Sequence, residues 1–334
     1  MIKLLNKISN FLRKNDRFLN RCTVFILVLF VFFIPPTPVQ DIYEVIELTE
    51  VTTYEFTFEI VNKSVEIETI IYEKDTIPVR SIEPLFWEHY REIYAHGQML
   101  GNNPNIFSRV GDSITVYVPF MYYFGTGDYN LTGKYDYLEQ TIDYFNTPTL
   151  DGNSFTSSTI AAVGGWSSEA ALNYERTDYE LCFDFEAPLE CEYRLKKPSI
   201  ALIMFGTNDV LWDDLEMFEK NMRLIIQFSI DKGVIPVIST IPPFYLTRGT
   251  ASHEYPYNLV IAKLAREYNI MLWDYWKSLL PLPNSGLFDD GVHPNFGWEY
   301  MTTDFREENL QYGMVVRNLE GLQILDQIRE KVLN

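Results

Sequence analysis

Residues 198–209 read PSIALIMFGTND, and this stretch decides the fold. Its first part, residues 198–205, is apolar apart from one serine and is followed directly by a Gly-Thr-Asn turn signal. A continuous apolar run of this length, closed by a turn, is typical of a strand that is buried on both faces. Such strands belong to parallel sheets with a layer of helices on each side, so the stretch predicts an α/β fold.

The sequence around this strand alternates between short apolar runs and helical periods. Three further strands are expected at residues 106–110 (IFSRV), 234–240 (VIPVIST) and 270–275 (IMLWDY). Helices are expected over residues 215–233, which end on a glycine typical of helix stops, and over residues 257–269. Residues 121–160 have no clear period, and we expect a loop-rich insertion there. The alternation predicts a three-layer α/β/α sandwich with a mainly parallel sheet over residues 85–334.

Four short motifs follow these strands or lie beyond them. They read GDSIT at 111–115, GGWSS at 164–168, GTND at 206–209 and DGVHPN at 290–295. Three of them come directly after a short apolar run, and the fourth lies on a later loop. Ligands of open parallel sheets bind outside the carboxyl ends of the strands, so the four motifs can meet at that edge.

The first and last motifs supply the groups of a nucleophilic serine site. A hydroxyl such as that of Ser113 is a poor nucleophile until a neighbouring base takes its proton. His293 can act as that base. Asp290, three residues earlier on the same turn, can orient the imidazole and stabilise its cation. These three residues are the candidate catalytic set.

The two middle motifs supply donors for a developing negative charge. Acyl transfer needs preorganised hydrogen-bond donors at the carbonyl oxygen. The backbone N–H groups of Ser113 and of a glycine in GGWSS, with the side-chain amide of Asn208, form such a set. Gly164 and Gly165 are both candidates for the glycine donor. We prefer Gly165, because it stands directly before the Trp-Ser-Ser helix start.

In this order, the four motifs resemble blocks I, II, III and V of the SGNH/GDSL hydrolase superfamily, over roughly residues 105–300. The letters of the family name map to Ser113, Gly165, Asn208 and His293. The D-x-x-H spacing of the family selects Asp290 over the adjacent Asp289. The resemblance implies a flavodoxin-like, five-stranded parallel sheet, a Ser-His-Asp triad, and neither a metal nor an organic cofactor. The G-x-S-x-G elbow of the α/β-hydrolases is absent around Ser113.

The charge of the chain excludes one class of partner. The formal net charge is −19 at pH 7, while residues 1–21 alone carry a net charge of +5, which leaves −24 for the rest. A body this acidic repels a phosphate backbone. We therefore expect no nucleic-acid partner.

The amino-terminal residues are typical of a targeting segment. The basic residues 1–21 precede the uncharged apolar run CTVFILVLFVFFI at 22–34, the layout of a signal peptide or a signal anchor. No A-x-A pattern marks a cleavage point, so we expect residues 1–40 to be an uncleaved anchor with the catalytic domain outside the cytoplasm. A cleaved signal and secretion are the alternative. Residues 41–84 alternate apolar and polar side chains, which predicts a small β-rich segment or stalk.

The cysteines are few. After Cys22, only Cys182 and Cys191 remain, and they flank the short loop CFDFEAPLEC. An outside location permits a disulfide between them, and two unpaired thiols are the alternative. The spacing does not fit a C-x-x-C zinc site.

Together these features predict a serine esterase that cleaves an O-acyl ester, with acetyl on a carbohydrate as the favoured substrate. The partner is then an acylated small molecule or polysaccharide, and the membrane is contacted through the amino-terminal anchor. An acyltransferase onto a glycan and a lipase or lysophospholipase are alternatives that use the same residues. A surface binding module without turnover is disfavoured, because no member of the catalytic set is missing. The sequence does not determine the oligomeric state.

Overall fold

A computed structural model describes residues 84–149, 151–212, 214–243 and 254–333. The expected anchor, residues 1–40, and all but the last residue of the expected β-rich segment, 41–84, lie outside these ranges. Both therefore stay predictions. Within the described ranges, no helix combines the length and the apolar character that a membrane crossing requires.

The core of the described part is a four-stranded parallel sheet in the order β1-β4-β5-β6. Its strands are β1 (Asn103–Gly111), β4 (Pro198–Met204), β5 (Ile235–Ser239) and β6 (Met271–Trp273). Each strand coincides with one of the four apolar runs, so the four strand predictions are confirmed. All 7 residues of β4 are buried, as expected for a strand covered on both faces.

The family resemblance implied five strands, and among the described residues this sheet has four. One more segment runs beside β1, where Ala162 forms an isolated parallel bridge with Gly111. Gly111 donates its N–H to the carbonyl of Ala161 at 3.0 Å, and Val163 donates to the carbonyl of Gly111 at 3.3 Å. The chain then turns away at Gly165, whose φ of +81° favours glycine. The pairing is therefore too short to form a fifth strand.

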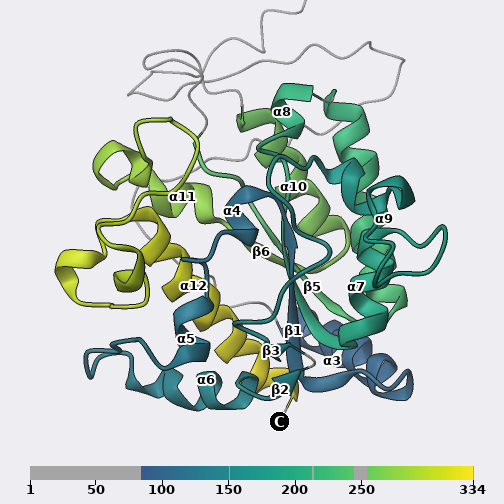
Figure 1. The fold of residues 1–334 in the computed structure, drawn as a ribbon, viewed down its shortest axis with the longest axis horizontal. Helices are drawn as coiled ribbons and strands as arrows, with labels where there is room; N and C mark the ends of the chain where they lie inside the picture. Colours follow the sequence, from purple (N-terminus) through teal and green to yellow (C-terminus); the bar gives the residue numbers. More distant parts are fainter. Residues whose placement is uncertain (1–83, 150, 213, 244–253, 334) are drawn as a thin grey trace, which may run out of the picture. The chain divides into compact units, whose positions relative to one another are not determined.

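Helices cover both faces of the sheet (Figure 1). α7 (Pro188–Lys196), α9 (Leu215–Asp231) and α10 (Tyr255–Glu267) lie on one side, and α6 (Glu139–Phe145) and α12 (Gly313–Ile328) lie on the other. The two predicted helices are α9 and α10. The carboxylate of Asp214 caps α9 by accepting the N–H of Met217 at 2.7 Å, and Gly233, with a φ of +64°, follows its end. The predicted three-layer α/β/α fold is confirmed.

The remaining elements are one long helix and several short helices and turns. α3 (Pro84–Met99) packs against the carboxyl-terminal π-helix η8 (Arg329–Leu333). The remaining helices are α4 (Ser113–Val116), α5 (Tyr122–Thr126), α8 (Asp209–Trp212) and α11 (Tyr275–Leu279). The 3₁₀ turns are η2 (Asp136–Leu138), η3 (Ser168–Leu172), η4 (Tyr174–Arg176), η5 (Pro283–Gly286), η6 (Glu299–Met301) and η7 (Glu307–Asn309).

Residues 121–160 are more regular than the expected loop-rich insertion. They contain α5, α6, η2 and the two-stranded antiparallel pair β2 (Pro148–Thr149) and β3 (Gly152–Asn153). Phe145 and Phe155 are fully buried and pack edge to face on Phe107 of β1. These aromatic anchors are too widely spaced to produce a periodic pattern, so burial in the core, and not local periodicity, orders this region.

Candidate active site

Ser113 begins α4, directly after the carboxyl end of β1 (Figure 1). The side chain of Asp112 caps this short helix by accepting the N–H of Ile114 at 3.0 Å. Gly111 is required at the turn, because a Cβ there would lie 2.4 Å from the carbonyl oxygen of Met204 in β4. The tight packing of this turn on the sheet holds Ser113 at the sheet edge, where it is partly exposed.

Ser113, His293 and Asp290 lie in one chain of hydrogen bonds. Ser113 Oγ is 3.0 Å from His293 Nε2, and His293 Nδ1 is 2.7 Å from Asp290 Oδ2. The other carboxylate oxygen of Asp290 accepts the backbone N–H groups of Val292 at 2.9 Å and His293 at 3.0 Å. The DGVHPN turn thus positions its own acid and imidazole through bonds that span only three residues.

The carboxylate of Asp290 determines which nitrogen of the neutral imidazole carries the proton. Desolvation raises the pKa of Asp290, but the N–H groups of Val292 and His293 and the imidazole outweigh this, so its pKa lies below the ordinary value. An ionised Asp290 at Nδ1 assigns the proton of neutral His293 to that nitrogen. Nε2 is then the acceptor that faces the hydroxyl of Ser113. This is the arrangement in which the imidazole can take the proton of the serine.

The two middle motifs bring hydrogen-bond donors to the same edge. A Cβ added to Gly164 would lie 3.9 Å from the Cβ of Ser113, which places the GGWSS turn beside the serine. The amide of Asn208 donates to the carbonyl of Trp166 at 2.9 Å, which uses one of its two N–H groups. The backbone N–H groups of Ser113 and Gly165 donate to no other residue in the described part of the chain. The four motifs therefore converge.

A buried polar contact ties the GTND motif to the GGWSS motif. Asp209 Oδ1 accepts the backbone N–H of Ser168 at 2.9 Å and also the Ser168 hydroxyl. The amide of Asn221 in α9 donates to the same hydroxyl at 3.3 Å. Asp209 and Ser168 are fully buried, so these bonds fix the position of the GTND turn relative to the GGWSS turn.

Arg317 supports α4, the helix that begins at Ser113, from the core side, and the four motifs gave no indication of it. It lies on α12, is 1% exposed, and donates to the carbonyl of Ile114 and to Thr115 Oγ1, the latter at 3.2 Å. Its guanidinium carbon lies 3.9 Å from the ring centroid of Phe120. A charged residue inside an apolar helical stretch, GMVVRNLEGLQILDQI, is the only sequence signal for this contact.

Two further buried groups belong to this support. Asn318, next on α12, accepts the N–H of Met121 at 2.8 Å and donates to the carbonyl of Pro119 at 2.8 Å. Desolvation raises the pKa of Asp112 to about 6, and the charge of Arg317 is one of the influences that oppose this rise. Asp112 and Arg317 are thus opposite charges buried behind the serine.

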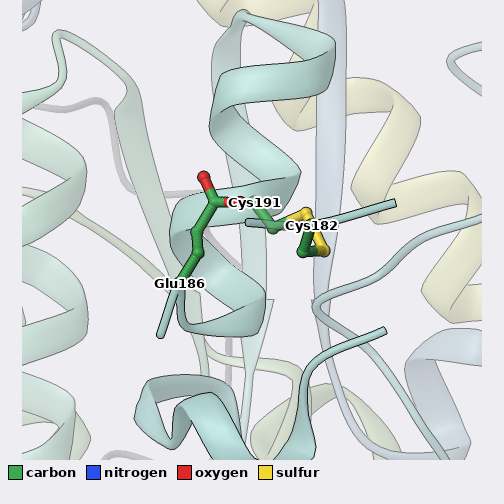
Figure 2. A group of neighbouring side chains, drawn as sticks. All are labelled: Cys182, Glu186 and Cys191. Atoms are coloured by element: carbon green, nitrogen blue, oxygen red, sulfur yellow. A yellow bond between two sulfur atoms is a disulfide. The ribbon is translucent and has the colours of Figure 1, made fainter. Parts of the chain in front are cut away.

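The only candidate metal cluster among the described residues is Cys182, Glu186 and Cys191 (Figure 2). The two sulfur atoms are joined in a disulfide, the pairing that the sequence favoured. The carboxylate of Glu186 is bound by Arg194 through two N–H donors, at 2.7 and 2.8 Å. These atoms are engaged with one another, so the cluster serves to close the loop between α7 and η4 and not to hold an ion.

Comparison with known protein families adds a match over the same residues. The model of the GDSL-like Lipase/Acylhydrolase family matches residues 110–296, more than half of the 334-residue chain. The match begins one residue before the GDSIT motif and ends one residue after DGVHPN. No curated protein sequence matches this chain.

Solved structures of esterases and lipases are similar at low identity. The acetyl xylan esterase AlAXEase is 19% identical with a TM-score of 0.42, and the match covers 68% of this chain and 98% of that one. The lipase/acylhydrolase from Enterococcus faecalis is 17% identical with a TM-score of 0.42, covering 67% and 95%. A GDSL-like lipase from Bacteroides thetaiotaomicron is 13% identical with a TM-score of 0.38, covering 72% and 98%.

Proposed function

The chain belongs to the GDSL-like lipase/acylhydrolase family and is an esterase of that type, and from this premise we propose that Ser113 is its nucleophile. His293 is the general base and Asp290 the residue that orients it. The substrate we propose is an O-acyl ester, with acetyl on a carbohydrate as the favoured case. The observation that carries the proposal is the unbroken chain of hydrogen bonds from Ser113 Oγ through the imidazole to Asp290.

The proposed reaction proceeds through an acyl-enzyme. The oxygen of Ser113 attacks the ester carbonyl while its proton moves to Nε2 of His293. Asp290 stabilises the resulting imidazolium, which then gives the proton to the leaving alcohol as the C–O bond breaks. Water enters next, loses a proton to His293, and attacks the acyl-enzyme. This second attack releases the acid and restores the serine hydroxyl.

The proposed oxyanion hole consists of three donors. The backbone N–H groups of Ser113 and Gly165 donate no hydrogen bond to any described residue. The side-chain amide of Asn208 has a second N–H besides the one that donates to the carbonyl of Trp166. Donors that are already oriented need no reorganisation when the carbonyl oxygen becomes negative. Gly164 remains the alternative to Gly165, because it lies closer to the Ser113 side chain.

Labelling with a fluorophosphonate probe tests this assignment. The folded wild type should be labelled, and Ser113→Ala should abolish both labelling and ester hydrolysis. Ser167→Ala is the matched control, since Ser167 lies in the neighbouring turn without a role in the proposed site, and it should label normally. Absence of labelling in folded wild type, or labelling that survives Ser113→Ala, would overturn the assignment.

The same sites serve an acyltransferase when a sugar hydroxyl replaces water in the second step. The two reactions are separated by the product. Incubation of the enzyme with an acetylated donor and an excess of a free oligosaccharide should release acetate stoichiometrically under the hydrolase proposal. Acetyl recovered on the acceptor would assign the transferase instead.

We also propose that residues 1–40 anchor residues 85–334 outside the cytoplasm, with residues 41–84 as a spacer. Support comes from the basic and apolar pattern of the amino terminus and from the disulfide of Cys182 and Cys191, which suits an oxidising compartment. Protease treatment of intact cells should cut the catalytic domain from a membrane-bound fragment. Protection of the domain under these conditions would refute the proposal.

A further inference from the structure

Exposed aromatic side chains lie on the two segments that lead out of the GDSIT and DGVHPN motifs. Tyr117 follows Ser113 by four residues, and Trp298 follows His293 by five. The two aromatic residues are 44% and 66% exposed. The ring of Phe296 lies 5.9 Å from that of Tyr117 and joins the two segments. We call Tyr117, Phe296 and Trp298 the aromatic rim.

Two contacts fix the segment that carries Trp298. On its amino-terminal side, Phe296 packs against Tyr117. On its carboxyl-terminal side, the hydroxyl of Thr302 donates to the carbonyl of Pro119 at 2.9 Å and is buried. Both contacts reach the stretch that leads directly out of the nucleophile helix. These contacts hold the segment that carries Trp298 beside that stretch, and the Trp298 side chain is exposed to solvent.

The segments that form the site are free of basic residues. Residues 110–133, 159–175, 205–219 and 278–305 contain no Lys or Arg. Their exposed acids include Asp289, Asp290 and Glu299 beside the rim. The buried Arg317 contacts the nucleophile helix from the core side and is 1% exposed, so it offers no charge to a ligand. These four segments thus offer no positive side chain to an anion.

We propose that the aromatic rim is a binding subsite for a sugar ring of a neutral acetylated glycan, with Trp298 and Tyr117 stacking on the ring. This inference rests on the proposed function and names the alcohol portion of its substrate. The C–H groups on one face of a sugar ring pack against the electron-rich face of an aromatic ring, and the hydroxyls at its edge remain in water. The exposed carboxylates near Trp298 can accept hydrogen bonds from those hydroxyls.

The acids beside the rim disfavour anionic lipid esters as substrates. Lysophospholipids are presented on micelles or membranes whose anionic members would be repelled by the acids around His293. A long acyl chain also needs a concave apolar pocket that buries most of its surface. The rim instead offers two rings that are about half exposed, the arrangement that suits a flat ligand which stays partly hydrated.

Comparing a large and a small ester isolates the rim. For Trp298→Ala, the KM for an acetylated neutral xylo-oligosaccharide should rise about tenfold, which corresponds to the loss of ~1.4 kcal/mol of stacking. Hydrolysis of ethyl acetate, which is too small to reach the rim, should stay within about twofold of wild type on the same energy scale. Trp298→Phe should restore most of the oligosaccharide affinity. Phe185→Ala, which removes an exposed ring outside the rim, should change neither reaction.

Three outcomes decide the inference. An equal loss on both esters for Trp298→Ala, or no loss on the oligosaccharide, overturns it. A higher kcat/KM of wild type on anionic lysophosphatidylglycerol than on the oligosaccharide overturns it as well, in favour of a lipid. Fluorophosphonate labelling of Ser113 is measured in parallel for each variant. If the enzyme is labelled but Trp298→Ala affects both esters alike, only the subsite is refuted. If the wild type is not labelled, the proposed function is refuted.

Discussion

The proposed nucleophile, Ser113, and the proposed base, His293, are held in opposite ways. Ser113 stands on a helix that is packed from behind by α12, by bonds from Arg317 that bridge 203 and 202 positions of the sequence. His293 stands on an exposed turn and is held by Asp290 through bonds that span three residues. The side chains of His293 and Asp290 are 40% and 47% exposed. One half of the site is built by tertiary structure, and the other half by its own motif.

This difference shows where each half is vulnerable. Removing a support of the nucleophile should lower the stability of the fold, because the supporting groups are buried charges and amides. Removing a partner of the base should leave the fold intact and reduce turnover alone. Each of the following variants tests one half of this contrast.

The largest effect is expected at the base. Asp290→Asn should lower kcat by about 10⁴-fold, because an amide can no longer hold the imidazole proton on Nδ1 or stabilise its cation. Asp289→Asn, the matched control, removes the same charge one residue earlier and should keep kcat near wild type. Steady-state kinetics and thermal melting measure both. Equal losses in the two variants, or a fall in melting temperature for Asp290→Asn alone, would break the contrast.

The next effect is expected behind the nucleophile. Arg317→Met should lower the free energy of unfolding by about 2–4 kcal/mol, since it removes the buried hydrogen bonds that Arg317 donates to the carbonyl of Ile114 and to the hydroxyl of Thr115. Arg223→Met removes partly exposed ion pairs with Glu219 and Glu267 and should cost less, about 1 kcal/mol. Urea unfolding compares the two variants. A cost for Arg317→Met as small as that of the surface variant would show that α12 does not support the serine.

A smaller effect on turnover is expected at Asn208, the proposed oxyanion donor of the GTND turn. Asn208→Ala should lower kcat by about 10²–10³-fold by removing one oxyanion donor. KM and the free energy of unfolding should change little. The amide is only partly buried, and its one hydrogen bond within the protein is to the carbonyl of Trp166. Single-turnover kinetics measure the chemical step directly. An unchanged chemical step would remove Asn208 from the proposed oxyanion hole.

The smallest effect is expected on the pH dependence of stability, and it comes from Glu320 on α12. Burial raises the pKa of Glu320 on α12 to about 7, although Ser278 and Trp273 donate hydrogen bonds to it. The folded chain therefore retains a proton that the unfolded chain loses above its ordinary pKa of 4.5. Stability from this group is fully present below pH 4.5 and falls as the pH rises to about 7.

Glu320→Gln removes this titration. At pH 8 the variant should be more stable than wild type by about 1–3 kcal/mol, on the scale of 1.36 kcal/mol for each pKa unit, and the difference should vanish towards pH 4. Urea unfolding at several pH values measures it. A stability difference that does not depend on pH would show that Glu320 is ionised in the folded protein throughout.

The same contrast explains what the sequence could predict. The four strands, α9, α10 and the DGVHPN turn depend on local patterns, and each was predicted from residues close in sequence. Arg317 and Asn318 act about 200 positions away from the residues they hold, and the sequence around α12 does not indicate which residues those are. The order of residues 121–160 was missed for the same reason, because Phe145 and Phe155 pack on Phe107 of β1, which lies outside the region.

The position of α12 also sets the time at which the enzyme becomes active. A ribosome makes Ser113 long before it makes Arg317, and folding of a domain begins while the chain is still emerging. The serine turn lacks its support throughout that interval. Nascent chains that stop before α12 should therefore be inert, and ester hydrolysis is expected only once α12 has docked.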